Sequence, residues 1–566
     1  MKVLASTLLL ASAVLGACAR GVEHVGKASL ANRYRDIRER ALEHHEHNRL
    51  VSRAPHQTKA KHLNSKTKKF AVDGAKLPLV PFDIGESYAG LMPISENKDE
   101  ERQLYFWYFP SSNPAATDEI TIWLNGGPGC SSLEGMLQEN GPFLMQYGAG
   151  PHAVPNPWSW QNLTNIVFVE QPVGTGFSQG TPNITSEAEL AEQFKGFYKN
   201  FAKTFSLQNK KIYITGESYA GMYVPHIASA MLDEEDKEFF NVEGTMIYDP
   251  SINTDAIMND VPAMAFLEYW KPLFGLNDTF VEELRQMDKE CGFTAYLEEN
   301  LVYPPKGKLP EPPKKSDKCD PFNKIIDAVM LVNPCWDIYQ IATTCPLLWD
   351  VLGFPGSFGY LPNGATIYFD RDDVKRAINA PVNFKWEECS SDNVFKTKSG
   401  LDSDAEAGHY SSFDVLPSVI ERSNRTVIAH GMLDYVLLVN GTLLSVQNMT
   451  WNGAQGLSKP VTEEFFVPYH DDLQTATLAG AGVMGTYRTE RGLSVITVAG
   501  AGHMVPQYTP SVAYRQLEFL LGRIDNLGSK EPFTKSDNGL KALPEGPQKR
   551  LVVGDAAVEA LLEQRS

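Results

Sequence analysis

Three residues in this chain have the types and the chain order of a nucleophile, an acid and a base. Ser218 lies in the run GESYAG, between an apolar run and a segment whose composition is compatible with a helix. Asp434 and His503 each follow another apolar run. A serine whose proton is taken by a histidine, with a carboxylate orienting that histidine, can attack a carbonyl carbon and form an acyl-enzyme. The sequence therefore predicts acyl-transfer chemistry on Ser218.

The residues around Ser218 fit the sharp turn between a strand and a helix that exposes a nucleophile above a sheet. The strict pattern has glycine two residues after the nucleophile, whereas this chain has Ala220 followed by Gly221. The requirement is steric, because the turn brings backbone atoms close together, and a methyl group is sometimes tolerated. Ordinary turns also contain such small residues, so the assignment depends on the rest of the chain.

Short apolar runs bounded by Pro, Gly and Asn predict the buried strands that must position these residues. Ser218, Asp434 and His503 all follow the carboxyl end of such a run, and active sites of open α/β sheets lie at that edge. The order Ser, Asp, His along the chain predicts an α/β-hydrolase fold. The expected strands lie at 104–109, 120–124, 166–169, 211–215, 245–248, 426–429 and 493–498.

A glycine-rich turn follows the second of these strands. The run WLNGGPGCSS occupies 123–132. Such a turn leaves backbone N–H groups free to point into a site, as an oxyanion hole requires. Taken alone, the run is equally compatible with a tight turn.

Composition narrows the class of protein. The chain has 566 residues, 43% of them hydrophobic, which is enough for a large core. Its net charge of -18 argues against a nucleic-acid partner. The histidines at 44, 45 and 47 have no second cluster with ligand spacing near them, so no metal or cofactor is expected.

The amino-terminal part differs from the rest in composition. Lys2, an apolar run and small residues up to Ala19 indicate a secretory signal peptide, with a lipoprotein cleavage box at 15–18 as the weaker alternative. The next segment holds thirteen Lys and Arg against five Asp and Glu, which fits a removable basic pro-segment or a solvated tail. We expect a signal peptide at 1–19, a pro-segment at 20–70, an α/β-hydrolase core at 71–251 and 401–527, a disulfide-rich cap at 252–400 and an extension at 528–566.

Two features fit the oxidising secretory pathway. Beyond the signal peptide six cysteines remain, an even number that favours three disulfides, and 15 connectivities are open. Five of the six lie between 291 and 389, where the regular alternation of strands and helices is lost, which is why a stapled cap is expected there. The candidate N-glycosylation sites are Asn162, Asn183, Asn277, Asn424, Asn440 and Asn448.

Four long runs resemble one known family. They are WLNGGPGCSS at 123–132, ENGP at 139–142, GESYAG at 216–221 and GHMVP at 502–506. In this order they resemble the serine carboxypeptidases over about residues 80–525, and the alanine at 220 belongs to that family's own elbow. The residues after Asp434 carry no cysteine and resemble a fungal secreted or vacuolar subgroup.

The resemblance implies roles for further residues. Backbone N–H groups of Gly127 and Tyr219 would hold the oxyanion. Asn125, Glu139 and Glu217 would bind the free carboxylate of a peptide substrate, with Trp123 supporting them. Neighbouring acids cannot all be ionised, so at least one must carry a proton and donate it, which implies an acidic pH optimum. The implied activity is release of C-terminal amino acids from peptides and proteins.

The resemblance also pairs Cys130 with Cys389. The other four cysteines, Cys291, Cys319, Cys335 and Cys345, permit three pairings that stay open. Because no cysteine follows Asp434, little sensitivity to mercurials is expected. The implied partners are peptides with a free C-terminus, with no nucleic acid, no membrane insertion and no cofactor.

Two alternatives share parts of this interpretation. An acyltransferase or esterase would use the same triad and differ only in the acceptor of the acyl group. A binding or chaperone-like protein could keep the fold, but the intact triad and acid pair argue against it.

Overall fold

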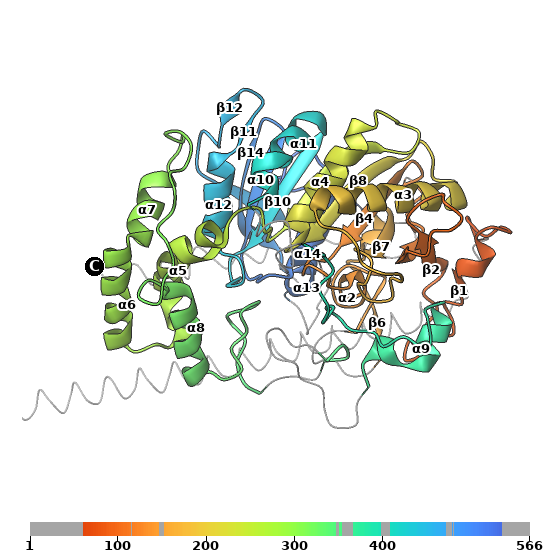
Figure 1. The fold of residues 1–566 in the computed structure, drawn as a ribbon, viewed down its shortest axis with the longest axis horizontal. Coiled ribbons are helices and arrows are strands. Elements are labelled where there is room, and N and C mark those ends of the chain that lie inside the picture. Colours follow the sequence, from red (N-terminus) through yellow and green to blue (C-terminus); the bar gives the residue numbers. More distant parts are fainter. Residues whose placement is uncertain are drawn as a thin grey trace, which may run out of the picture.

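The apolar runs of the sequence form the strands of one mixed sheet (Figure 1). The computed structural model describes residues 60–114, 116–145, 152–346, 350–353, 366–397, 408–470, 478 and 480–534. Within these residues the strand order is β1-β2-β3-β7-β4-β8-β9-β10-β15-β14-β13. The expected signal peptide and most of the expected pro-segment lie outside the described residues.

Parallel pairing dominates the middle of this sheet, and antiparallel strands close both edges. All seven expected strands are present, each within a few residues of its expected bounds. The parallel strands are β7 (Asn165–Glu170), β4 (Glu119–Leu124), β8 (Lys211–Glu217), β9 (Asn241–Tyr248), β10 (Arg425–Gly431) and β15 (Leu493–Val498). The edge strands are β1 (Ala71–Val72), β2 (Ser87–Pro93), β3 (Gln103–Phe109), β13 (Glu463–Val467) and β14 (Gly482–Glu490).

The central strands bury both of their faces. In β9, Met246 and Tyr248 belong to one apolar core and Ile247 to another. Successive side chains of a strand point to opposite faces, so helices must cover the sheet on both sides. One face packs against α3 (Glu187–Phe205) and α4 (Ala220–Asp233), and the other against α2 (Ser132–Gln138) and α14 (Pro510–Leu520).

The segment between β9 and β10 is more regular than the sequence suggested. The expectation that strand and helix order is lost over 252–400 is wrong, because α6 and its neighbours are well-formed helices. In α6 the Asn277 side chain caps the first turn, Val281 and Leu284 are buried, and Gly292 ends the helix at φ 83°. The α-helices described within 252–400 are α5 (Val261–Phe274), α6 (Asp278–Cys291), α7 (Phe293–Asn300), α8 (Pro321–Val332) and α9 (Asp372–Ala377).

Four of these helices form a group beside the sheet. Figure 1 shows α5, α6, α7 and α8 together, away from α3 and α4. Apolar residues of α5, α6 and α8 make a separate small core, which includes Leu267, Leu284 and Ile325, and those of α7 belong to a further one. Two disulfides, Cys291–Cys319 and Cys335–Cys345, lie in this region. A third joins Cys130 to Cys389 across 259 residues of sequence.

Both ends of the described chain pack onto the core. Phe70 is buried beside Phe106 and Phe205, although it belongs to the expected pro-segment. Phe533, in the expected extension, packs on Trp158 with ring centroids 4.9 Å apart. Among the described residues, none of the helices is both long and apolar enough to cross a bilayer.

Shorter elements complete the described fold. They are η1 (Lys68–Phe70), β5 (Phe143–Leu144), β6 (Val154–Pro155), η2 (Trp160–Asn162), η3 (Ala256–Asp260), η4 (Tyr368–Asp370), α10 (Ser411–Asp414), α11 (Leu416–Arg422), α12 (Val439–Asn448), β11 (Thr450–Trp451), β12 (Ala454–Gln455) and α13 (Val505–Tyr508).

Candidate active site

Ser218 occupies a strained turn directly after β8. Its φ of 61° lies in the left-handed region that residues other than glycine rarely adopt. The turn is held by backbone hydrogen bonds, because Ser218 N–H donates to Tyr248 O at 2.9 Å and Ser251 N–H donates to Ser218 O at 3.0 Å. The next helix, α4, begins at Ala220. The strand, turn and helix expected around Ser218 are therefore present.

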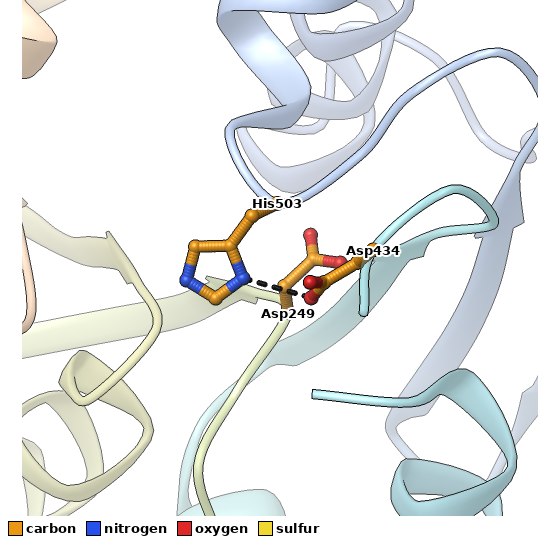
Figure 2. A group of neighbouring side chains, drawn as sticks. All are labelled: Asp249, Asp434 and His503. Carbon is orange, nitrogen blue, oxygen red and sulfur yellow. Dashed lines mark hydrogen bonds and ion pairs between the residues drawn. The ribbon is translucent and has the colours of Figure 1, made fainter. Parts of the chain in front are cut away.

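Asp434 and His503 form a buried pair. His503 Nδ1 lies 2.8 Å from Asp434 Oδ2 (Figure 2), and both side chains are buried. The other carboxylate oxygen, Oδ1, accepts the N–H of Val436 at 2.7 Å. Since a carboxylate accepts at Nδ1, the proton on that nitrogen is fixed and Nε2 is left as the basic atom.

A second carboxyl group lies beside this pair. Asp249 directly follows β9 and is fully buried. One oxygen of Asp249, one of Asp434 and a ring nitrogen of His503 all lie within 4.8 Å of one another (Figure 2). The N–H of Gly431 donates to Asp249 Oδ1 at 2.8 Å. Burial, followed by the charge of Asp434, raises the pKa of Asp249 well above its ordinary value.

The glycine-rich turn after β4 lies against the nucleophile. A Cβ atom on Gly126 would come within 2.4 Å of Tyr219 N and 2.8 Å of Ser218 Cβ. Gly127 has a φ of 113°, which favours glycine. The turn is fastened to the chain near Cys389, because Ser131 N–H donates to Glu388 O at 2.7 Å. Close approach to Ser218 therefore requires glycine at 126, and backbone conformation favours it at 127.

Asn125 is hydrogen-bonded to two other residues expected at the carboxylate-binding site and to one that was not expected. Its side-chain oxygen accepts the indole N–H of Trp123 at 2.7 Å. Its side-chain amide donates to Glu217 Oε1 at 2.8 Å and to Glu134 Oε2 at 2.7 Å. Both oxygens of Glu139, and Oε2 of Glu217, are buried with no hydrogen-bond partner among the described residues.

The three glutamates form a compact, buried group. Oxygens of Glu134, Glu139 and Glu217 lie within 4.8 Å of one another, and all three side chains are buried. Burial, then the charges of Glu217 and Glu134, raise the pKa of Glu139 well above its ordinary value. Burial and the charge of Glu134 raise that of Glu217, and burial raises the pKa of Glu134 to about 7. At acidic pH the group therefore carries protons that it can donate.

Both of these groups have a geometry that could hold a cation. In the first group, His503 Nδ1 and Asp434 Oδ2 already form a hydrogen bond with each other, which a metal would have to break. In the second, protonated carboxyl groups would have to lose their protons before a metal could bind. We therefore assign no metal, and a metal-free site stays a prediction.

The comparisons with known proteins agree with this geometry. Residues 78–522 match the model of the family described as serine carboxypeptidase. The chain belongs to this family. It is 59% identical over 518 residues to a probable serine carboxypeptidase of Arthroderma benhamiae, covering 90% of this chain and 95% of the relative. It is also 47% identical to serine-type carboxypeptidase F of Aspergillus niger, covering 82% and 89% of the two chains.

A solved structure supports the fold of this serine carboxypeptidase. The prohormone-processing carboxypeptidase Kex1 of Saccharomyces cerevisiae covers 82% of this chain and 99% of its own, with a TM-score of 0.58 and 21% identity. The expected α/β-hydrolase fold and the expected family are confirmed. The enzyme is a serine-type carboxypeptidase, and the names of its relatives do not favour the acyltransferase alternative.

Sequence reasoning missed three residues at the site of this carboxypeptidase. Asp249 follows a predicted strand directly, so the rule that found Asp434 also applies to it. Glu134 lies between the family motifs at 123–132 and 139–142, where only its acidity could have drawn attention. Tyr339 has no local signal: its ring lies 5.2 Å from that of His503, and its backbone oxygen accepts the His503 N–H at 2.8 Å.

Proposed function

We propose that Ser218, His503 and Asp434 are the nucleophile, base and acid of this carboxypeptidase. The observation that carries this assignment is the buried 2.8 Å contact between His503 and Asp434 at the carboxyl edge where Ser218 stands in its strained turn. His503 Nε2 takes the proton from the Ser218 hydroxyl as its oxygen attacks the last peptide carbonyl. The proton passes to the leaving amino acid, and water then releases the acyl group.

The tetrahedral intermediate places a negative oxygen near the glycine-rich turn. We propose that the N–H groups of Gly127 and Tyr219 stabilise it. Two observations support this role: the turn lies against Ser218, and Tyr219 directly precedes the first residue of α4. The positive end of a helix dipole favours an anion at this point.

We propose that Asn125, Glu139 and Glu217, with Trp123 behind them, bind the free carboxylate of the substrate. The raised pKa values of Glu139 and Glu217 support this role, because a protonated carboxyl group donates to a carboxylate and an ionised one repels it. Glu134 would ionise as the pH passes about 7. The KM for a substrate with a free carboxylate should therefore be low in acid and should rise above that pH.

The deciding experiment compares a blocked dipeptide with its C-terminal amide from about pH 4 to about pH 8. We expect the free acid to be cleaved best in acid, and the difference between the substrates to shrink as the pH rises. Ser218→Ala should be inactive on both, while Ser423→Ala, which changes a half-buried serine after α11, should match the wild type. Hydrolysis of simple esters alone, with neither peptide cleaved, would support the esterase or acyltransferase alternative.

We propose that the protein passes through the secretory pathway and is secreted or vacuolar. The three disulfides of the structure favour an oxidising compartment. Of the six candidate glycosylation sites, Asn183, Asn277 and Asn424 are exposed. Asn448 is half-buried, and its side-chain oxygen accepts the N–H of Leu309 at 2.9 Å. We expect glycans on the exposed sites, which enzymatic deglycosylation followed by peptide mass measurement would map.

We further propose that the signal peptide at 1–19 is followed by a removable basic pro-segment. The packing of Phe70 into the core supports an end to this segment well before that residue. We also propose that residues 252–400 form a cap and that residues 528–566 form a carboxy-terminal extension. The mature amino terminus, measured on protein from the culture medium, tests the processing site.

A further inference from the structure

Asp249 and Asp434 are two carboxyl groups that must share one buried space. They follow the neighbouring parallel strands β9 and β10, and neither is exposed. Asp249 Oδ1 accepts the N–H of Gly431, whereas no N–H or hydroxyl group of the residues described donates to Oδ2. Two ionised carboxylates at this separation repel each other strongly in a buried site, so one of them holds a proton.

The nearby His430 supplies no positive charge to balance them. Its Nε2 lies 2.7 Å from Leu437 O, and a carbonyl oxygen can only accept, so Nε2 carries the proton. Its Nδ1 lies 2.9 Å from the hydroxyl of Thr442, which can donate to it. Burial lowers the pKa of His430 to about 4, so the ring is neutral above that pH.

The hydrogen-bond donors decide which carboxyl group is ionised. Asp434 faces the N–H groups of Val436 at 2.7 Å and Leu437 at 3.4 Å, together with His503. Asp249 Oδ1 accepts the N–H of Gly431 at 2.8 Å and lies 3.4 Å from His430 Nε2, whose proton makes its shorter contact, 2.7 Å, with Leu437 O. Asp434 is therefore the carboxylate, and the proton belongs on Asp249 Oδ2.

The other titratable groups around Asp249 favour the same assignment. Glu217 at the end of β8 and Tyr248 at the end of β9 become negative if they ionise. The charge of Glu217 adds to the effects that raise the pKa of Asp249. With His430 neutral, the only group of this set that can become positive is His503, which already contacts Asp434.

We propose that Asp249 is a positioning residue, whose neutral carboxyl group donates a hydrogen bond from Oδ2 to the Asp434 carboxylate. This inference depends on the proposed role of Ser218, His503 and Asp434. The hydrogen bond holds Asp434 in place and draws off part of its negative charge. Protonation of His503 then becomes less favourable, so the base stays active at the acidic pH where the glutamates can bind a carboxylate.

Two substitutions test the proposal through the pH dependence of kcat/KM for a blocked dipeptide. Asp249→Asn keeps a donor that faces Asp434, so we expect activity within about threefold of the wild type and an unmoved acid limb. Asp249→Leu removes the donor, so we expect the acid limb to move up by about one pH unit and kcat to fall at least tenfold. Asp288→Asn, which changes a buried carboxyl group on α6, serves as the control and should leave the profile unchanged.

Other results would overturn the proposal. An unmoved acid limb in Asp249→Leu, or an equal shift in both variants, would show that Asp249 does not act through a donated hydrogen bond. Asp249→Ala takes the place of the leucine variant if that protein fails to fold, as judged by its melting temperature, because alanine only removes atoms. Activity surviving in Ser218→Ala would instead reject the proposed function, so the two failures are distinguishable.

Discussion

The two buried acid groups of the site contain similar side chains and are suited to opposite tasks. The group of Asp249, Asp434 and His503 has a base and several backbone N–H donors, which stabilise one negative charge. The group of Glu134, Glu139 and Glu217 has the side-chain amide of Asn125 and no base within it. The first group therefore stabilises one ionised carboxylate, and the second is protonated at acidic pH. The hydrogen-bond donors and charges around each carboxyl group determine its ionisation state.

The largest expected effect comes from removing the negative charge of Asp434. Asp434→Asn should lower kcat by about four orders of magnitude, because an amide can place the wrong hydrogen on His503 and cannot stabilise the imidazolium. Steady-state rates on a blocked dipeptide measure the loss, and Ser218→Ala sets the background. A variant that keeps a tenth of the wild-type rate would contradict the assignment of Asp434.

The same chemical change should be mild in the other group. Glu217→Gln keeps a donor beside the substrate carboxylate, so kcat/KM at about pH 4.5 should fall by roughly tenfold or less. The measurement uses the free acid and the amide of one dipeptide in parallel. A loss as large as that of Asp434→Asn would mean that Glu217 must be ionised, and the comparison between the two groups would fail.

Glu134 should set the upper pH limit for binding a free carboxylate. Burial raises its pKa to about 7, so it is neutral and able to donate below that pH, and charged and repulsive above it. Glu134→Gln cannot ionise, so its KM for the free acid at about pH 8 should be roughly three- to tenfold lower than that of the wild type. The amide substrate is the control, because it carries no carboxylate. Equal KM values for both proteins across the pH range would exclude this role.

Buried glutamates that are protonated in the folded protein should also make its stability depend on pH. Burial raises the pKa values of Glu134 and Glu170 from 4.5 to about 7, so the folded protein binds more protons than the unfolded chain between those values. Each contribution is fully present below pH 4.5 and is lost as the pH rises through about 7. The free energy of unfolding should therefore fall by a few kcal/mol across this window. Melting temperatures measured at both ends check the sign, and Glu170→Gln should flatten the dependence. A melting temperature that rises with pH would contradict the claim that the folded protein binds more protons than the unfolded chain.

The smallest expected effect is the response to mercurials. All six cysteines within the described residues are paired in disulfides, so no thiol among them can react. Activity after incubation with a mercurial should equal that of an untreated sample. Inhibition that a reducing agent reverses would reveal a reactive thiol near the site.

The sequence predicted the parts of the molecule that local patterns encode. The strand runs, the turn at Ser218 and the acid and histidine after their strands depend on short-range composition, and the strands and the turn form as expected. The helices after β9 were not predicted, although α6 has local signals: Asn277 caps its first turn, Val281 and Leu284 are buried at helical spacing, and Gly292 ends it. What the sequence does not give is their partner, because many of their apolar residues pack in a core separate from the sheet. Tyr339 reaches His503 only through tertiary packing, so the residues beside Tyr339 in the sequence give no indication of this contact.

The segment that contains the proposed cap leaves the sheet after β9 and returns at β10, and these two strands are hydrogen-bonded neighbours. An insertion whose ends lie side by side can grow, shrink or be exchanged without altering the register of any strand. The residues of the proposed triad follow strands that such changes leave in place. Two attachments to the site come from this segment, because Tyr339 O accepts the His503 N–H and Cys389 is bonded to Cys130 in the glycine-rich turn. Selection can therefore vary the rest of the segment while these two attachments are kept.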